Sequence, residues 1–302
     1  MAWMWKRKWV ITSGLILAVF LFVLVVLNYL EKLVWGQNLG DGWTFSWQNR
    51  ASEGRSSSYV SVPNQEPLKL HCDVCSVVSS SGQVLGRRAG AEIEQAGCVW
   101  RMNNAPTRGF ERDVGRRTDL RVVSHTSVPL LLHRPKYFFG PAANGTVYVV
   151  WGPRRNMRED GTGQVYNMLR RAVDDYPNAR IYVTTEERMN HCDALFKKET
   201  GRDRIQSGSY LSTGWFTLIL AMDICKEIRI YGMVNNTHCK SESRKKVPYH
   251  YYENGSRNEC AEYLLHENAP YGGHRFITEK AVFAKWAKSH PIKFFHPEWH
   301  LS

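Results

Sequence analysis

Two histidine-containing segments in the C-terminal third of the chain have residues suited to acid–base chemistry. His274 and Glu279 are the ends of His-Arg-Phe-Ile-Thr-Glu, and His250 opens the block His-Tyr-Tyr-Glu. Histidine can accept a hydroxyl proton at mildly acidic pH because its ordinary pKa is about 6.5. A lone histidine ahead of a helix is more often structural, and His-Tyr-Tyr-Glu also fits a hydrogen-bonded aromatic cluster at a strand end. Residue type alone therefore leaves both interpretations of these segments open.

Two polar segments earlier in the chain suit a nucleotide or a phosphate. Asn103 and Asn104 offer paired amide donors and acceptors, which can recognise the edge of a base or a sugar. Ser212 or Thr213 can cap the apolar helix that follows, and the positive end of that helix suits a phosphate or carboxylate. An ordinary N-cap with a buried helix behind it explains the second segment equally well. The chain has no Asp-x-Asp, a pair of carboxylates that could hold a divalent metal.

Alternating strand-like and helix-like segments must position these residues. This alternation predicts one Rossmann-like α/β domain, with a mostly parallel twisted sheet and helices on both faces. Ligands bind beyond the carboxyl ends of such strands, which directs attention to Ser79–Gly82, Asn103–Ala105 and the loop after Tyr231. The expected strands are Ser76–Val78, Val99–Met102, Leu120–Ser124, Val147–Trp151, Ile181–Thr184, Ile228–Tyr231 and Ile292–Phe295. The expected helices include Gly163–Asp175, Glu186–Lys198, Thr213–Cys225 and Glu279–Ser289.

The N-terminus carries an apolar run, Val10–Leu27, directly after the basic residues Lys6, Arg7 and Lys8. Its length and the preceding positive charge predict a type II signal anchor with the rest of the chain in the lumen. A cleaved signal peptide and a buried core helix are the alternatives. The predicted organisation is a cytoplasmic tail (1–9), a transmembrane anchor (10–30), a stem (31–65) and a lumenal catalytic domain (66–302).

Cysteines, sequons and charge fit a lumenal protein. The chain has seven cysteines, so at least one thiol is left over if the others form disulfides within the chain. Cys72-x-x-Cys75 also has the spacing of a redox pair or half a zinc site, but no other segment supplies the remaining zinc ligands. A net charge of +12 suits anionic sugars, nucleotides or membrane, whereas lumenal topology argues against nucleic acid. Candidate glycosylation sites are Asn144, Asn235 and Asn254.

Four blocks in the chain closely resemble, in order, the motifs of animal sialyltransferases, glycosyltransferase family 29. The resemblance spans about residues 75–280 and implies a sialyltransferase variant of the GT-A-like fold. The first block contains C-S-V-V-S-S-S-G from Cys75, R-M-N-N-A-P from Arg101 and D-V-G-R-R-T from Asp113. The other three are the segment from Ser209 to Gly232, His250-Tyr-Tyr-Glu, and His274 with Glu279.

The resemblance implies CMP-sialic acid as donor. It maps Ser80, Asn103 and Ser124 onto contacts with cytidine, ribose or phosphate, although another branch of the family has Asn at the position of Ser124. It also implies that His250 and Tyr251 reach the nucleotide phosphate. The first two blocks thus become two halves of one donor site.

The resemblance also implies how transfer proceeds. Ser212, Thr213 and Gly214 would face the carboxylate of sialic acid or the phosphate, and His274 would be the general base. Glu279 would orient a loop or cap the last helix, without an assigned chemical role. A monophosphate donor needs less charge compensation than a diphosphate, so we expect an inverting single displacement that uses no metal and no cofactor.

In the family, one cysteine of the first block bridges to one of the second, and the matching residues are Cys75 and Cys225. Such a bridge would join the two halves of the donor site across a long loop. Further bridges are plausible between Cys72 and Cys98 and between Cys239 and Cys260, which leaves Cys192 as the odd thiol.

Finer similarity is to the short-stemmed types III and IV of the N-acetylgalactosaminide α-2,6-sialyltransferases, and the ending His296–Ser302 favours type III. This implies transfer to the GalNAc 6-hydroxyl of sialyl-α2,3-Gal-β1,3-GalNAc on glycoproteins or gangliosides, in the Golgi membrane. The alternatives are a galactose or sialic acid acceptor, or a Golgi glycan-binding homologue without turnover. The sequence leaves open whether the protein is a homodimer.

Overall fold

The computed structural model describes residues 58–241 and 246–300. The predicted tail and anchor, residues 1–30, lie outside these ranges, as does most of the predicted stem. Within the described ranges, no helix has both the length and the apolar character needed to cross a bilayer.

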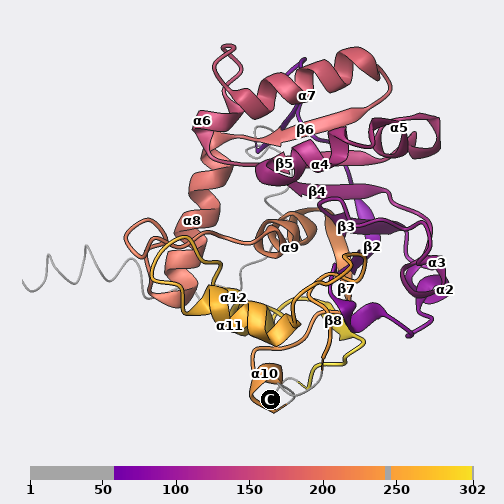
Figure 1. The fold of residues 1–302 in the computed structure, drawn as a ribbon. Coiled ribbons are helices and arrows are strands. Elements are labelled where there is room, and N and C mark those ends of the chain that lie inside the picture. The colour runs from indigo at the N-terminus through magenta and orange to yellow at the C-terminus, as the bar shows by residue number, and fades with distance from the viewer. Residues whose placement is uncertain (1–57, 242–245, 301–302) are drawn as a thin grey trace, which may run out of the picture. The chain divides into compact units, whose positions relative to one another are not determined.

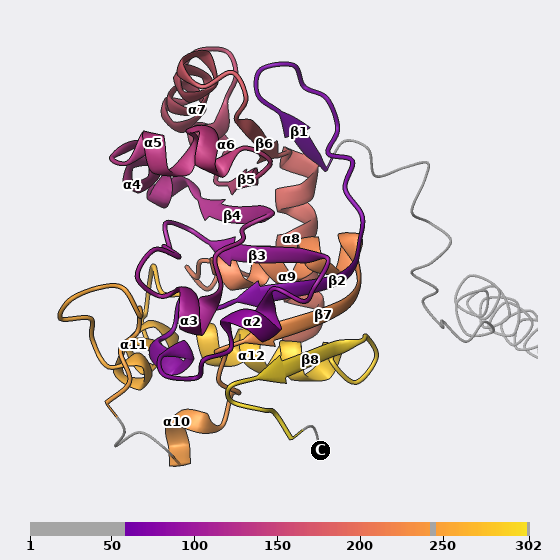
Figure 2. The ribbon, with the colours of Figure 1, turned by 90° about the vertical axis from the view of Figure 1, so that its right-hand side faces the viewer.

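The described residues form an eight-stranded sheet in the order β1-β6-β5-β4-β3-β2-β7-β8. β1 runs antiparallel to β6, and all other neighbouring strands are parallel, which confirms the predicted mostly parallel sheet. Figure 2 shows the strands from β6 down to β8. The strands are β1 (Tyr59–Ser61), β2 (Cys72–Val78), β3 (Cys98–Met102), β4 (Leu120–Ser124), β5 (Val147–Trp151), β6 (Arg180–Thr184), β7 (Cys225–Tyr231) and β8 (Ile292–Phe295).

Helices cover both faces of the sheet, because alternate residues of its central strands point to opposite sides. In β5, Val147 and Val149 pack with residues of α8, α9 and α12, whereas Tyr148 and Val150 pack with α4, α5 and α7. Figure 1 shows α8 and α9 on one side of the strands and α2 and α3 on the other. The helices are α2 (Gly90–Ile93), α3 (Glu111–Val114), α4 (Val128–Leu132), α5 (Pro135–Phe138), α6 (Arg154–Met157), α7 (Gln164–Asp175), α8 (Glu186–Thr200), α9 (Thr213–Ile224), α10 (His238–Ser241), α11 (Glu259–Glu267) and α12 (Phe276–Trp286), with 3-10 turns η1 (Gly82–Val84), η2 (His125–Ser127) and η3 (Pro141–Ala143).

Several boundaries differ from the sequence prediction. β1 falls within residues 31–65, the predicted stem, yet it pairs with β6 and belongs to the folded domain. β2 and β7 begin three or four residues earlier than expected, because their polar starts pair with each other from Cys72 and Cys225 onward. α12 begins at Phe276, ahead of the predicted start at Glu279, and α11 was not predicted. Pairing between distant segments thus extends these strands beyond the runs of β-branched residues from which they were predicted.

Helix α9 is apolar on every side because it is buried in the core. Eight of its twelve residues are buried, as expected for a helix without a polar face. It packs against β3, β4 and β7. Because β7 starts directly after α9 and the helix packs back along it, the N-terminus of α9 lies near the carboxyl ends of the strands.

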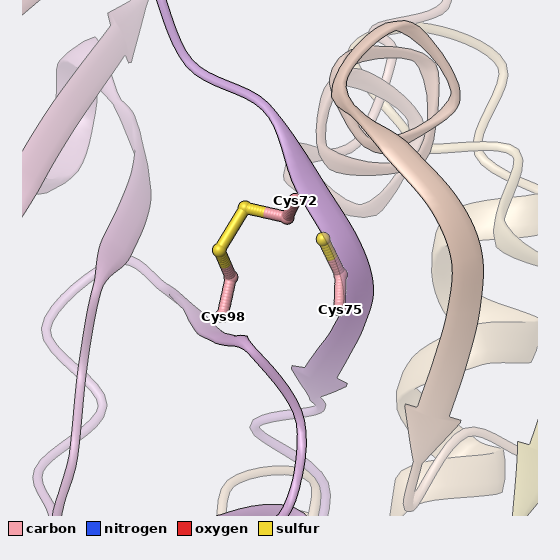
Figure 3. Close-up of side chains that lie close together, drawn as sticks. All are labelled: Cys72, Cys75 and Cys98. Atoms are coloured by element: carbon pink, nitrogen blue, oxygen red, sulfur yellow. A yellow bond between two sulfur atoms is a disulfide. The ribbon is translucent and has the colours of Figure 1, made fainter.

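Three disulfides brace this arrangement, and they are the pairs that the sequence analysis named. Cys75 pairs with Cys225 across 150 residues and joins β2 to β7, and the third bridge is Cys239 to Cys260. Cys72 pairs with Cys98, close to Cys75 (Figure 3). Cys72 and Cys75 thus have different partners, which excludes a redox pair between them.

The remaining thiol, Cys192, is buried in α8. Burial raises the pKa of this thiol to about 12, so it stays protonated and inert at physiological pH.

Candidate functional site

Two hollows lie along the carboxyl edge of the sheet. The first, called here the small pocket, measures about 90 Å³ and lies beyond β2, β3 and β7. The second, the large cavity, measures about 1040 Å³ and lies beyond β4, β5 and β6. Of the predicted site residues, the small pocket is lined by Ser80, Asn103, Ser212, Gly214 and His250. The large cavity is lined by Ser124 and His274.

Asn103 lies between these two hollows and is firmly oriented. Its φ of +47° is a left-handed conformation that asparagine tolerates better than most residues. Its side-chain oxygen accepts hydrogen bonds from the Ser124 amide at 2.9 Å and the Thr213 hydroxyl at 3.5 Å. Its backbone carbonyl accepts a bond from buried Arg121 at 2.7 Å. The side-chain nitrogen, Nδ2, has no hydrogen-bond partner among the described residues and is left to donate to a ligand.

The turn after β2 is tied to the His-Tyr-Tyr-Glu block. The Gly82 amide donates to the Pro248 carbonyl at 2.9 Å, and the Tyr251 amide donates to the Ser80 carbonyl at 2.9 Å. A Cβ at Gly82 would lie 2.5 Å from the Pro248 ring, so only glycine fits this close approach. The first and third sequence blocks therefore form one wall of the small pocket.

Within that block, the structure separates the histidine from the predicted tyrosine. His250 lines the small pocket, with Nδ1 2.8 Å from a carboxylate oxygen of Glu253. Tyr251 is buried in the core instead, where its hydroxyl donates to the Pro106 carbonyl. Burial raises the pKa of Tyr251 to about 12. The tyrosine that lines the pocket is Tyr249, the residue just before His250.

The side chain of Glu279, a residue of α12, lies at the N-terminus of α9. Its carboxylate accepts hydrogen bonds from the Ser212 amide at 2.9 Å and from the Ser212 hydroxyl, while the same hydroxyl caps the Trp215 amide at 3.1 Å. Burial raises the pKa of Glu279 to about 7, although both bonds from Ser212 lower it. Glu279 thus joins α12 to α9 and leaves the Thr213 and Gly214 amides of the first turn to meet a ligand.

Lys280 places a buried cation beside the small pocket. It lines the pocket and is only 5% exposed. Its ammonium lies 3.6 Å above the Tyr263 ring, and no ion pair joins it to a carboxylate among the residues that the structure describes. Burial lowers the pKa of Lys280 to about 8, against the raising effect of Glu259 and Glu279. A ligand phosphate would compensate this charge.

His274, in the loop before α12, forms part of the wall of the large cavity. Its Nδ1 lies 3.0 Å from the Tyr210 carbonyl oxygen. A carbonyl can only accept, so Nδ1 carries the proton and Nε2 is the atom able to take another. Burial lowers the pKa of His274, more than the bond to Tyr210 raises it. The neutral, proton-accepting form therefore persists below the ordinary range of histidine.

A second histidine fixes the His274 backbone. The His274 amide donates to Nδ1 of His266 at 3.3 Å, which requires that nitrogen to be unprotonated. The other ring nitrogen, Nε2, lies 3.2 Å from a carboxylate oxygen of Glu262. The two imidazole rings stack with centroids 5.4 Å apart. His266, on α11, thus holds the backbone of His274 in place, and Glu262, on the same helix, orients the His266 ring.

The sequence analysis did not single out Tyr249, Lys280, His266 or Glu262. A signal existed for Lys280, because Glu279 and Lys280 interrupt an otherwise apolar helical face in Phe-Ile-Thr-Glu-Lys-Ala-Val-Phe. No local pattern distinguishes His266 from a solvent-exposed histidine, since its role depends on the chain returning to it at residue 274.

Among the described residues, one group of side chains has the spacing of metal ligands, namely Cys72, Cys75 and Cys98. All three sulfurs are consumed in disulfides, so none is a thiolate that binds a metal. The predicted glycosylation sites differ in exposure: Asn144 and Asn254 are exposed, and Asn235 is half-buried.

Comparison with protein families matches residues 34–290 to the model of Glycosyltransferase family 29 (sialyltransferase). Human alpha-N-acetylgalactosaminide alpha-2,6-sialyltransferase 3 is 60% identical over 308 aligned positions, which cover 100% of this chain and 100% of its own. The mouse protein of the same name is 67% identical over 244 residues, 81% of this chain and 79% of its own.

A second human relative, alpha-N-acetyl-neuraminyl-2,3-beta-galactosyl-1,3-N-acetyl-galactosaminide alpha-2,6-sialyltransferase, is 54% identical and covers 80% of each chain. The crystal structure of a mammalian sialyltransferase superposes with a TM-score of 0.47 and 21% identity, over 74% of this chain and 69% of that one.

Proposed function

Since the chain belongs to glycosyltransferase family 29, the sialyltransferases, we propose that it transfers sialic acid from CMP-sialic acid to the 6-hydroxyl of GalNAc. The proposed acceptor is sialyl-α2,3-Gal-β1,3-GalNAc on O-glycoproteins or gangliosides. The names of the relatives at 60% and 54% identity support the GalNAc acceptor and the α-2,6 linkage.

The observation that carries this proposal is the proton-accepting nitrogen of His274 at the wall of the large cavity. Nε2 takes the proton of the GalNAc 6-hydroxyl while that oxygen bonds to the anomeric carbon of sialic acid. On the opposite face the bond to the phosphate oxygen breaks, and CMP leaves with the electron pair. One displacement of this kind inverts the anomeric configuration.

The small pocket suits the phosphate end of the donor. At about 90 Å³ it is too small for a whole nucleotide sugar. Lys280 and the first turn of α9 supply positive charge and hydrogen-bond donors for the phosphate and the leaving oxygen, and His250 lines the same pocket. The rest of the donor then extends past Asn103 and Ser124, where the two hollows approach each other.

These same groups support a reaction without metal or cofactor. Lys280 is a buried cation that can neutralise the leaving phosphate in place of a metal. The chain has no Asp-x-Asp to bind such an ion. Transfer should therefore continue at full rate in EDTA, and loss of activity that added Mg²⁺ or Mn²⁺ restores would contradict this part of the proposal.

The test of the function is transfer by the purified full-length protein from CMP-sialic acid to a panel of acceptors. The panel contains the sialylated trisaccharide, Gal-β1,3-GalNAc, a galactose-terminated N-glycan and a ganglioside that carries the trisaccharide. We expect a new α-2,6 linkage on GalNAc, identified by linkage analysis of the product. Transfer only to galactose or to sialic acid would refute the proposed acceptor.

The proposed location is the Golgi membrane, in type II orientation with residues 66–302 in the lumen. The apolar run Val10–Leu27 and the sequons at Asn144, Asn235 and Asn254 support it. N-glycans on the protein made in cells, released by peptide N-glycosidase, would show that the domain entered the secretory pathway. An unglycosylated, carbonate-extractable protein would contradict this location.

A further inference from the structure

Four arginines line the large cavity, and three of them are already paired with carboxylates. A carboxylate partner takes up part of the charge and of the hydrogen bonds of a guanidinium, so a paired arginine binds an anionic ligand less well than an unpaired one. The pairs are Arg154 with Glu186 at 2.7 Å, Arg158 with Asp160, and Arg204 with Asp193 at 2.5 Å.

Arg155 is the fourth arginine. It is exposed in the cavity wall and forms no ion pair with a carboxylate of the described residues. One carboxylate of the cavity, Glu159, also lies outside the three pairs. Its charge acts on Tyr166, whose pKa is raised chiefly by burial and further by Glu159. Arg155 and Glu159 are therefore separate charges rather than a fourth pair.

Arg155 lines the same cavity as His274, the proposed base, and as His125. Burial lowers the pKa of His125, and the positive charge of Arg155 lowers it further. The same charge acts on Tyr271, whose ring contacts that of Tyr210 with centroids 6.4 Å apart. Tyr210 is the residue whose carbonyl holds His274. The unpaired cation and His274 thus line one cavity, in which an acceptor could contact both.

We propose that Arg155 binds the carboxylate of an acidic sugar on the acceptor, and thereby selects glycans that already carry sialic acid. This inference rests on the proposed function and assigns its acceptor preference to one side chain. A guanidinium suits the task because its planar fork donates two parallel hydrogen bonds to a carboxylate. An unpaired cation in a cavity also raises the local concentration of anionic ligands.

The experiment follows the design of a double-mutant cycle, in which one substitution in the protein is combined with one chemical change in the acceptor. Arg155→Gln and the unmodified protein are each tested with sialyl-α2,3-Gal-β1,3-GalNAc and with the same trisaccharide whose carboxylate is converted to the amide. For the unmodified protein we expect kcat/KM to fall about 10- to 100-fold on amidation, the range of a charge-assisted hydrogen bond. With the acid acceptor, kcat/KM of Arg155→Gln should fall by the same factor relative to the unmodified protein. Amidation of the acceptor should then lower kcat/KM of this variant almost no further. Its KM for CMP-sialic acid should stay unchanged.

Two further variants separate recognition from folding. Arg155→Lys keeps the charge without the fork and should retain part of the preference for the acid. Arg171→Gln removes an exposed arginine of α7 that does not line the cavity and should leave both acceptors unaffected. Thermal unfolding and donor KM identify any variant that is merely damaged.

The outcomes distinguish this inference from the function on which it rests. Absence of transfer by the unmodified protein to every acceptor would overturn the function and, with it, the inference. Transfer with an acid-over-amide preference that Arg155→Gln leaves intact would overturn the inference alone. Equal use of acid and amide by the unmodified protein would also overturn it, because no carboxylate would then be recognised.

Discussion

The small pocket and the large cavity lie along the same edge of the sheet but are built differently. The small pocket is formed by residues directly after strands and at helix ends, and half-buried or buried side chains such as Asn103, Ser212 and Lys280 line it. The large cavity owes its charge to exposed and half-buried arginines and acids in loops, on α6 and on α8. The first is positioned by backbone hydrogen bonds, whereas the second is positioned by ion pairs at the surface.

This difference corresponds to a division of labour. A pocket fixed by buried hydrogen bonds suits one donor of constant structure, because displaced polar groups there are costly. A cavity bounded by exposed loops can change its charge pattern without disturbing the core. The loop before α12 and the helix itself link the two, since His274 belongs to the cavity while Glu279 and Lys280 belong to the pocket.

The largest expected effect is at His274, the proposed base in the wall of the large cavity. His274→Gln should lower kcat about 100- to 10,000-fold, the range for removal of a general base. The KM for CMP-sialic acid should stay within a factor of two or so, because the donor pocket keeps its residues. Steady-state kinetics with both substrates varied provides the measurement. His133→Gln, an exposed histidine in the loop after α4, is the matched control, and a variant at 274 with ordinary kcat would remove the proposed base.

Lys280→Met should separate the two regions. Loss of the buried cation is expected to raise the KM for CMP-sialic acid about 10- to 100-fold, as for a hydrogen bond to a charged group, and to leave the acceptor KM unchanged. Lys285→Met, on the same helix but exposed and paired with Glu199, controls for the loss of a lysine. An equal rise in both KM values would show that the pocket and the cavity are not distinct binding regions.

A smaller effect is expected at His266, which accepts a hydrogen bond from the backbone amide of His274. His266→Ala removes the acceptor of the His274 amide and should reduce kcat about tenfold, the value of one hydrogen bond and its geometry. The KM values for CMP-sialic acid and for the acceptor should stay unchanged. His266→Asn, whose side-chain oxygen can replace Nδ1, should recover most of the rate. Failure of asparagine to do better than alanine would assign His266 a packing role in place of a positioning one.

The pH dependence gives the smallest effect. Because burial lowers the pKa of His274, the neutral base persists as the pH falls. The rate should therefore be level near neutrality and decline on the acid side only below about pH 6.5, the ordinary pKa of histidine. Single-turnover rates across pH 5 to 8 measure this limb. A decline that begins clearly above pH 6.5 would mean that the pKa of His274 is raised, which contradicts the lowering expected from its burial.

Strands and helix starts were well predicted from sequence where local pattern dominates. β4, β5 and β8 have the predicted boundaries, and Ser212 caps α9 as its residue type suggested. The starts of β2 and β7 were missed because their polar residues are held in the sheet by pairing with each other. β1 was assigned to the stem for the same reason: three residues acquire strand structure only against β6.

The sequence by itself determined the α/β alternation, the order of the family motifs and the histidine that serves as candidate base, because periodicity, capping and motif spacing are properties of neighbouring residues. Only the tertiary structure decided that Tyr249 rather than Tyr251 faces the pocket, that Lys280 is buried beside it, and that Arg155 alone among four cavity arginines lacks a carboxylate among the described residues. Each of these facts depends on which distant segment lies opposite a side chain. Burial and charge pairing follow from that juxtaposition, and they turn a list of polar residues into two hollows with the proposed roles of donor pocket and acceptor cavity.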